Sequence, residues 1–175
     1  MRFEGLQKIQ QTFKAEEIDY ENCGGFEIIN DESFLQKIAE VNLNLKPITQ
    51  TENTFVLNSE KIAEFGLKNS KYLVENSLEG ALHSGKLVQK LMKKAQDLGI
   101  DFLFGSDVSE IIENNDEVEL RIENFSLKTQ KLVIATNAFS KNLLPEIDVI
   151  PVRVQILLTK PIGNLKLKGT FHYDE

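Results

Sequence analysis

Few side chains in this sequence have the types and spacing that acid–base, nucleophilic or metal chemistry needs. The chain has two histidines, His83 and His172, and one cysteine, Cys23. A histidine without a placed carboxylate or metal partner rarely carries chemistry, so structural roles are favoured for both. Cys23 precedes a glycine pair and is expected to be a small buried residue. Two histidines and one cysteine make no metal site at any spacing in the chain.

A turn of backbone is a stronger candidate for a ligand contact than any of these side chains. Residues 131–134 are a short apolar run of β-formers, typical of a strand covered on both faces. Ala135, Thr136 and Asn137 follow, and their small or polar side chains would let the backbone lie close to a ligand. The residues alone leave open the alternative that a buried strand simply ends in a small polar turn.

Composition limits the classes of protein to which the chain can belong. It has 175 residues, with 41% hydrophobic and 27% charged residues, as in ordinary globular proteins. The net charge of -7, with lysines scattered among acids, argues against a nucleic-acid-binding surface. A single cysteine allows no intrachain disulfide. No apolar run approaches a membrane span and no signal-peptide core is present, so we expect a cytoplasmic protein.

The first part of the chain alternates helices and short strands. Apolar spacing predicts a helix from Phe3 to about Glu17, and a second helix that is capped by Asn30 or Asp31 and ended by Pro47. A short helix ended by Gly66 follows. The predicted strands are 23–29, 55–57 and 71–75.

The second part contains the clearest helix and a run of strands. Ser84 is the expected N-cap of a helix that ends at Gly99. A strand over 100–104 would follow directly, as in a parallel α/β layer. Strands at 108–113, 117–123 and 125–129 predict an antiparallel meander, inserted before the strand at 131–134. Further strands are predicted over 151–159 and from Gly169 onward. The fold class is therefore α/β, or mixed α+β.

This order of elements resembles the FAD-dependent oxidoreductases of the D-amino-acid oxidase, glycine oxidase and sarcosine oxidase type. The residues that carry the resemblance are 84–88, 99–100, Val108, 133–140, 151–157, 25–27 and 169–173. The order and spacing of these residues carry it, because no single motif is diagnostic.

The resemblance implies an FAD-binding Rossmann-like layer with the inserted meander, and an antiparallel substrate domain. Residues 1–80 would belong to the substrate domain, 81–145 to part of the FAD domain, and 146–175 to return strands of the substrate domain. Val108 would face the adenine end of FAD, and Ala135, Thr136 and Asn137 its pyrophosphate side. Arg153, Gln155 and His172 are weaker candidates for lining the substrate cavity. The implied reaction is hydride transfer from the carbon bearing an amine, in an amine or amino acid, to the flavin.

The sequence departs from this family in one feature. A Gly-x-Gly-x-x-Gly turn that cradles the pyrophosphate is absent, and the pair Gly24-Gly25 has the wrong spacing. Both ends also look cut, so we expect a piece of a longer protein that does not hold FAD stably by itself. The alternative is a non-enzymatic α+β domain that binds a ligand or a partner. The sequence leaves the substrate, the electron acceptor, the flavin linkage and the oligomeric state open.

Overall fold

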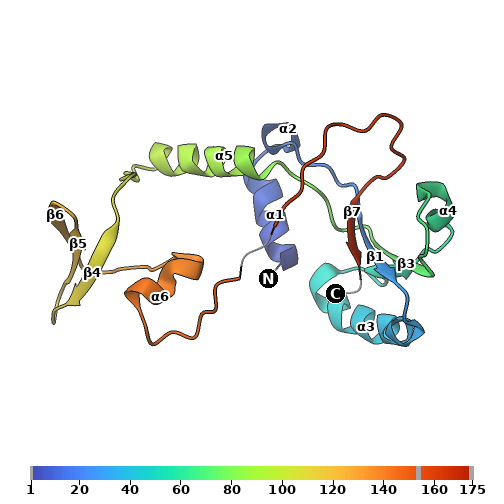
Figure 1. Ribbon diagram of the computed structural model, residues 1–175, viewed down its shortest axis with the longest axis horizontal. Helices are drawn as coiled ribbons and strands as arrows, with labels where there is room; N and C mark the ends of the chain where they lie inside the picture. Colours follow the sequence, from blue (N-terminus) through green and yellow to red (C-terminus); the bar gives the residue numbers. More distant parts are fainter. Residues whose placement is uncertain (1, 153–154, 174–175) are drawn as a thin grey trace. The chain divides into compact units, whose positions relative to one another are not determined.

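A four-stranded mixed sheet joins strands that are far apart in the sequence (Figure 1). Its order is β2 (Phe55–Leu57), β3 (Tyr72–Asn76), β1 (Gly25–Ile29) and β7 (Thr170–Tyr173). β1 pairs antiparallel with β3 and parallel with β7. The structure is a computed structural model and describes residues 2–152 and 155–173.

The chain divides into two compact units, Met1–Ile100 with Ile162–Glu175, and Asp101–Pro161. The sheet lies in the first unit, and the meander lies in the second. The other elements of the first unit are α1 (Arg2–Thr12), α2 (Ala15–Ile18), η1 (Glu32–Lys37), α3 (Ile38–Thr49), α4 (Lys61–Phe65) and α5 (Ser84–Asp97). The second unit contains β4 (Val108–Glu113), β5 (Val118–Ile122), β6 (Phe125–Thr129), η2 (Asn137–Phe139) and α6 (Ser140–Leu143). The chain is thus a mixed α/β protein, as predicted.

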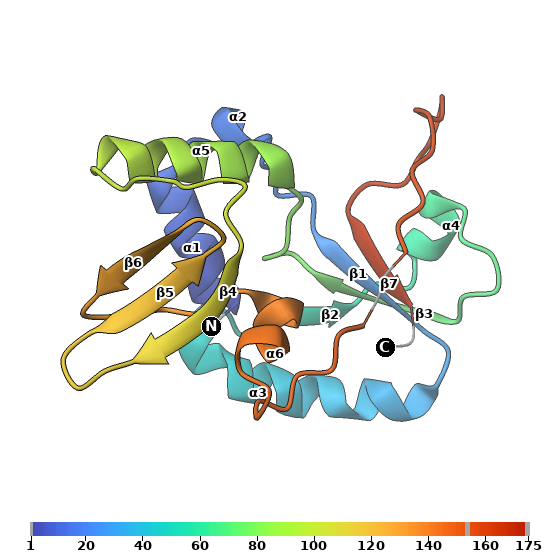
Figure 2. The same ribbon diagram turned by 60° about the vertical axis from the view of Figure 1, so that its left-hand side comes forward.

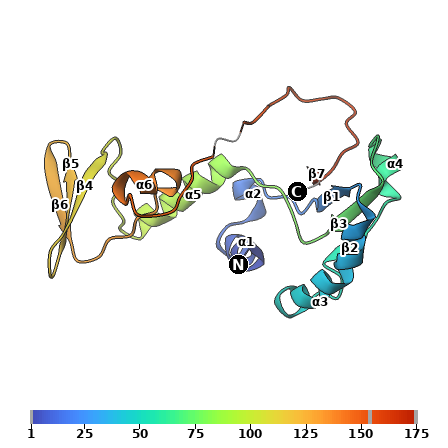
Figure 3. The same ribbon diagram turned by 60° about the horizontal axis from the view of Figure 1, so that its bottom comes forward.

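One face of the four-stranded sheet is closed by aromatic packing. The register places Phe26 of β1 beside Phe171 of β7, and their rings stack with centroids 5.1 Å apart. Phe65 of α4 meets both rings edge-on, at 5.1 and 5.5 Å. Offset-stacked and edge-to-face rings at these distances stabilise a core beyond the area they bury. We call this the aromatic face; α4 covers it, while α3 lies on the other side of the sheet (Figure 3).

An ion pair borders the aromatic face. The Lys61 ammonium lies 2.7 Å from a carboxylate oxygen of Glu75 and 5.3 Å from the centroid of the Phe26 ring. Asn58 donates from Nδ2 to the same carboxylate at 2.7 Å. Burial is the largest single influence on the pKa of Glu75 and raises it, but the bonds from Lys61 and Asn58 together outweigh burial. The pKa of Glu75 is therefore lowered from its ordinary value.

A close approach between two glycines sets the parallel pairing of β1 and β7. Gly169 has φ +105°, and a Cβ added there would lie 2.6 Å from the Phe26 ring and 2.8 Å from the carbonyl oxygen of Gly24. The next amide, that of Thr170, donates to this carbonyl at 3.1 Å. Only glycine meets both the backbone conformation and the contact distance. The predicted strand beyond Gly169 is thus confirmed.

The short helix α2 packs against α5. α2 contacts α5, and ion pairs at 2.7 and 2.8 Å join Lys86 to Asp19 and Lys90 to Glu17. The N-cap of α5 is His83 rather than the predicted Ser84, because Nδ1 of His83 accepts from the Lys86 amide at 3.3 Å. Among the described residues, no helix has both the length and the apolar character that crossing a membrane requires.

Helix α3 extends past Pro47, the residue that was predicted to end it. Asp31 caps η1 as predicted, accepting from the Ser33 amide at 2.9 Å, and α3 then runs to Thr49 with Pro47 inside. Pro47 lies in the last turn, where it removes one backbone bond, to the carbonyl of Leu43. Leu43 is 71% exposed, so water can satisfy that carbonyl and the helix continues. The prediction for Pro47 was therefore wrong.

The predicted antiparallel meander is confirmed in the second unit (Figure 2). Its order is β4-β5-β6, and Ile122 of β5 is buried. The exposed side chains of Arg121 and Glu110 form an ion pair at 2.7 Å across β4 and β5. α6 contacts β4.

Three predicted strands are absent from the described residues. Residues 100–104 and 131–134 form no strand, and neither do 151–152 and 155–159 on either side of the undescribed 153–154. Val133 and Leu157 are 85% and 89% exposed. The Phe102 and Phe104 rings stack at 5.7 Å, the i, i+2 relation of an extended chain. These segments have strand-forming side chains, but no neighbouring strand in the described chain completes a ladder with them.

Replacing Gly169 with alanine is expected to weaken the β1–β7 pairing. The Cβ would meet the Gly24 carbonyl and the Phe26 ring, so Gly169→Ala should lower the free energy of unfolding by about 1–3 kcal/mol. Urea denaturation measures this change. Gly163→Ala is the matched control, because nothing lies within 4 Å of its added Cβ and its φ is not positive. Equal stability of the two variants would contradict the close approach.

The Glu75 pair predicts a stability difference that depends on pH. Because the pKa of Glu75 is below its ordinary value of 4.5, its contribution is present above that pH and is lost as the pH falls through the folded-state pKa. Glu75→Gln should lower the free energy of unfolding by about 1–2 kcal/mol at neutral pH, and the difference should vanish in acid. Denaturation across the pH range measures it. Glu110→Gln, which breaks an exposed pair, should have little effect at any pH.

Candidate functional site

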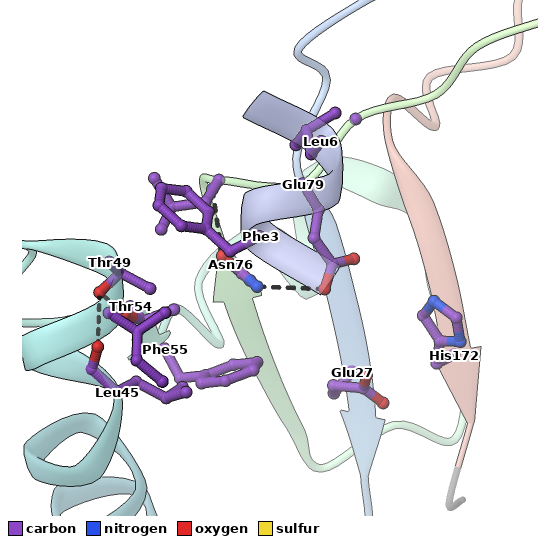
Figure 4. A pocket seen from close by; sticks show the side chains of 13 residues that line it. Phe3, Leu6, Glu27, Leu45, Thr49, Thr54, Phe55, Asn76, Glu79 and His172 are labelled. Carbon is purple, nitrogen blue, oxygen red and sulfur yellow. Dashed lines mark hydrogen bonds between the residues drawn. The ribbon is translucent and has the colours of Figure 1, made fainter. Parts of the chain in front are cut away.

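The face of the sheet opposite the aromatic face borders a cavity. A cavity of about 530 Å³ lies against it, within the first unit (Figure 4). Apolar side chains line it from two helices: Phe3 and Leu6 of α1, and Leu45 and Ile48 of α3. Polar side chains line it from the sheet and from the segment after β3. We call this the cavity face.

Strand register places two titratable side chains side by side on the cavity face. In the parallel pair of β1 and β7, Glu27 lies opposite His172. Alternation along a strand puts Glu27 and His172 on one face and Phe26 and Phe171 on the other. Figure 4 shows the carboxylate and the imidazole on neighbouring strands at the cavity. His172, a predicted site residue, thus lines a cavity.

A second carboxylate is held over the end of β1. The buried Asn76 donates from Nδ2 to Oε1 of Glu79 at 3.0 Å, and its own Oδ1 accepts from the Leu78 amide at 3.0 Å. Oε2 of Glu79 would lie 2.0 Å from a Cβ added at Gly25. Gly25 therefore leaves the space that the carboxylate occupies. Glu79 is half-buried and lines the cavity.

The wall formed by α3 is fixed to the edge of the sheet by one buried amide. Asn42 donates from Nδ2 to the Phe55 carbonyl at 2.8 Å, and its Oδ1 accepts from the Phe55 amide at 2.8 Å. Both backbone groups of an edge-strand residue are thereby satisfied by one side chain. A hydroxyl contact of 3.0 Å between Thr49 and Thr54 lies beside it. These bonds position the α3 side chains that line the cavity.

The described part of the lining combines carboxylates with apolar side chains. Among the described residues that line it are Glu27, Glu79 and His172, and none is lysine or arginine. Carboxylates in a partly dry cavity attract cations and hydrogen-bond donors. The described chain has no group of three or more His, Cys, Asp or Glu residues placed to hold a metal ion.

The other predicted site residues lie in the second unit or outside the described residues. Val108 begins β4, pairs with Ile122 and is half-buried. Ala135, Thr136 and Asn137 are exposed.

These three residues lead into a short helix. Asn137 has φ +48°, and the hydroxyls of Thr136 and Ser140 are 3.0 Å apart. The predicted small polar turn is therefore present although the strand before it is not. Val108 and this turn belong to one unit, in which α6, just after the turn, contacts β4.

Two further residues were predicted to line the substrate cavity. Gln155 is exposed and lies in the second unit, and Arg153 lies outside the described residues. Cys23 is half-buried rather than buried.

Sequence reasoning missed Glu27, Asn76 and Glu79. Glu27 gave one usable signal, since it is the only charged residue in an otherwise apolar strand. Asn76 and Glu79 gave none, because their roles depend on tertiary contacts.

Comparison with known proteins assigns the family. The model of the FAD-dependent oxidoreductase family named DAO matches residues 1–174. The chain belongs to this family, as its order of elements indicated. N-methyl-L-tryptophan oxidase from Escherichia coli is 27% identical over 92 residues, which are 53% of this chain and 25% of that protein.

Solved structures share the fold. L-proline dehydrogenase from P. horikoshii superposes with a TM-score of 0.72 at 16% identity, over 95% of this chain and 48% of that one. Glycine oxidase from Geobacillus kaustophilus superposes with a TM-score of 0.63 at 13% identity, over 81% of this chain and 40% of that one. The chain therefore spans half the length of these proteins or less.

The stability of the cavity wall at α3 is expected to depend on the buried amide of Asn42. Asn42→Ala removes both bonds to Phe55 and should lower the free energy of unfolding by about 1–3 kcal/mol. Amide hydrogen exchange at Phe55 should also accelerate. Asn44→Ala, on the same helix but exposed, is the matched control and should change stability by less than about 0.5 kcal/mol. Similar exchange rates at Phe55 in both variants would show that α3 does not depend on this contact.

Proposed function

We propose that this chain is part of an FAD-dependent enzyme that oxidises an amine or amino acid, and that its cavity face receives the substrate. The observation that carries the proposal is the cavity of about 530 Å³ on one face of the sheet, in a chain of this family. A concave site that is mostly apolar, with a few convergent polar groups, is the usual form of a small-molecule site. His172 and Glu27 are the polar groups of the sheet that such a substrate would meet.

The proposed FAD contacts are the backbone at Val108 and the turn at Ala135, Thr136 and Asn137. The exposed turn and the left-handed Asn137 suit a close approach of a ligand to the backbone. A Gly-x-Gly-x-x-Gly cradle does not occur in the 175 residues, so these contacts would hold only part of the cofactor. When bound, FAD supplies the acceptor for the hydride on the carbon that bears the amine.

The proposed assignment of residues to a substrate domain and an FAD domain follows the resemblance. Residues 1–80 and 146–175 would serve the substrate domain, and residues 81–145 the FAD domain. His172 is supported as a substrate contact because it lines the cavity. Arg153 and Gln155 are proposed on the resemblance alone.

The visible spectrum of the full-length gene product tests this function. We expect flavin absorption bands that bleach when an amine or amino-acid substrate is added without oxygen. A full-length product without flavin, whose cavity still binds small molecules, would instead support a non-enzymatic binding domain.

His172→Ala should raise KM more than it lowers kcat if the imidazole only binds substrate.

A second expectation concerns the 175-residue chain alone. Because it lacks the glycine-rich cradle, the purified chain should not retain FAD through gel filtration, and its visible spectrum should show no flavin bands. A yellow preparation with stoichiometric flavin would contradict this expectation and would show that Val108 and the turn at 135–137 suffice.

A further inference from the structure

The side chain and the backbone of Glu79 are each held by a neighbouring amide. The Asn76 amide binds Oε1 at 3.0 Å, and Asn76 is itself buried and fixed by the Leu78 amide. Oε2 lies over Gly25, in the space that any larger residue would fill. The backbone carbonyl of Glu79 accepts from the Gly24 amide at 3.0 Å. A carboxylate that a buried amide orients at a cavity is preorganised to bind a ligand.

The described lining around Glu79 lacks the basic side chains that would bind an anionic ligand. None of the described residues that line the cavity is lysine or arginine. Lys46, which follows Leu45 on α3, pairs with Glu52, and Lys61 pairs with Glu75 beside the aromatic face. An anionic group at Glu79 would be repelled, whereas an ammonium would gain a charge-assisted hydrogen bond.

The reaction restricts which nitrogen Glu79 can bind. In the proposed reaction, FAD would accept the hydride of the C–H bond that breaks, and the nitrogen lone pair would form the new C=N bond. That nitrogen must therefore be unprotonated when it reacts. A carboxylate beside an amine favours its protonated form. The nitrogen held at Glu79 is thus unsuited to be the one that is oxidised.

We propose that Glu79 recognises a second cationic group of the substrate, so that the substrate class is an amine or amino acid with an additional ammonium. The carbon chain between the two nitrogens would lie along the apolar lining from α1 and α3, such as Leu6 and Leu45. Glu79 is then a specificity-determining residue. The identification of this ligand as a substrate rests on the proposed function; its binding does not.

Three probes with the same four-carbon amine test the proposal: 1,4-diaminobutane, 1-aminobutane and 4-aminobutanoate. They differ only in the group at the far end, which is an ammonium, a methyl or a carboxylate. Their Kd values for the ¹⁵N-labelled 175-residue chain are measured by NMR titration, following the amides of Gly25, Asn76 and His172. We expect the diamine to bind most tightly, at least twofold more so than 1-aminobutane, because it presents an ammonium to Glu79 in either orientation, and 4-aminobutanoate, whose carboxylate is repelled, to bind most weakly.

Two variants locate the preference at Glu79. Glu79→Gln removes the charge and should abolish the preference for the diamine. Gly25→Ala keeps the charge but displaces the carboxylate, since its Cβ would lie 2.0 Å from Oε2, and should have the same effect. Glu64→Gln, exposed on α4, is the matched control and should retain the preference.

Each outcome decides between the proposals. Equal affinities for the three probes, or a diamine preference that survives in both Glu79→Gln and Gly25→Ala, would overturn the role of Glu79. The titration needs no flavin, so a full-length protein without FAD would defeat the proposed function and leave the diamine preference standing. Conversely, a flavoenzyme whose cavity shows no charge preference would defeat only this inference.

Discussion

The parallel pairing of β1 with β7 is the contact on which the first unit depends. It joins residues about 145 positions apart and has Gly24 and Gly169 at its start, where a Cβ on Gly169 would lie 2.8 Å from the Gly24 carbonyl oxygen. A shift of one residue would reverse the faces of both strands. The same register that stacks Phe26 on Phe171 also places Glu27 beside His172. Core and cavity are therefore set by one alignment.

The two faces of the sheet use polar groups in different ways. On the aromatic face, Glu75 is matched at once by Lys61 and Asn58, and the pair closes the edge of a ring cluster. On the cavity face, Asn76 fixes Glu79 but leaves Oε2 directed over a glycine. A carboxylate whose bonds are all internal stabilises the fold, whereas one that is only oriented remains available for a ligand. This difference separates the structural acid from the candidate functional one.

Local patterns predicted the elements that can form from their own residues. The helix at α5, the Gly66 stop and the meander were read correctly because capping, helical spacing and hairpin turns are local. The strands over 131–134 and 151–159 were wrong in the described residues, since a strand also needs a neighbour. Glu79 could not be predicted, because its role arises from Asn76 and Gly25, and only folding brings the three together.

The turn at 135–137 forms without the strand that was predicted to lead into it. Residues 131–134 form no strand, yet Asn137 has a left-handed conformation and the Phe139 amide donates to the Thr136 carbonyl at 3.0 Å. These bonds lie within the turn and the following helix, so no ladder is needed to form them. If this turn contacts FAD as proposed, its preformed shape reduces the ordering that cofactor binding requires. A strand at 131–134 would then only position the turn, whose conformation is already formed.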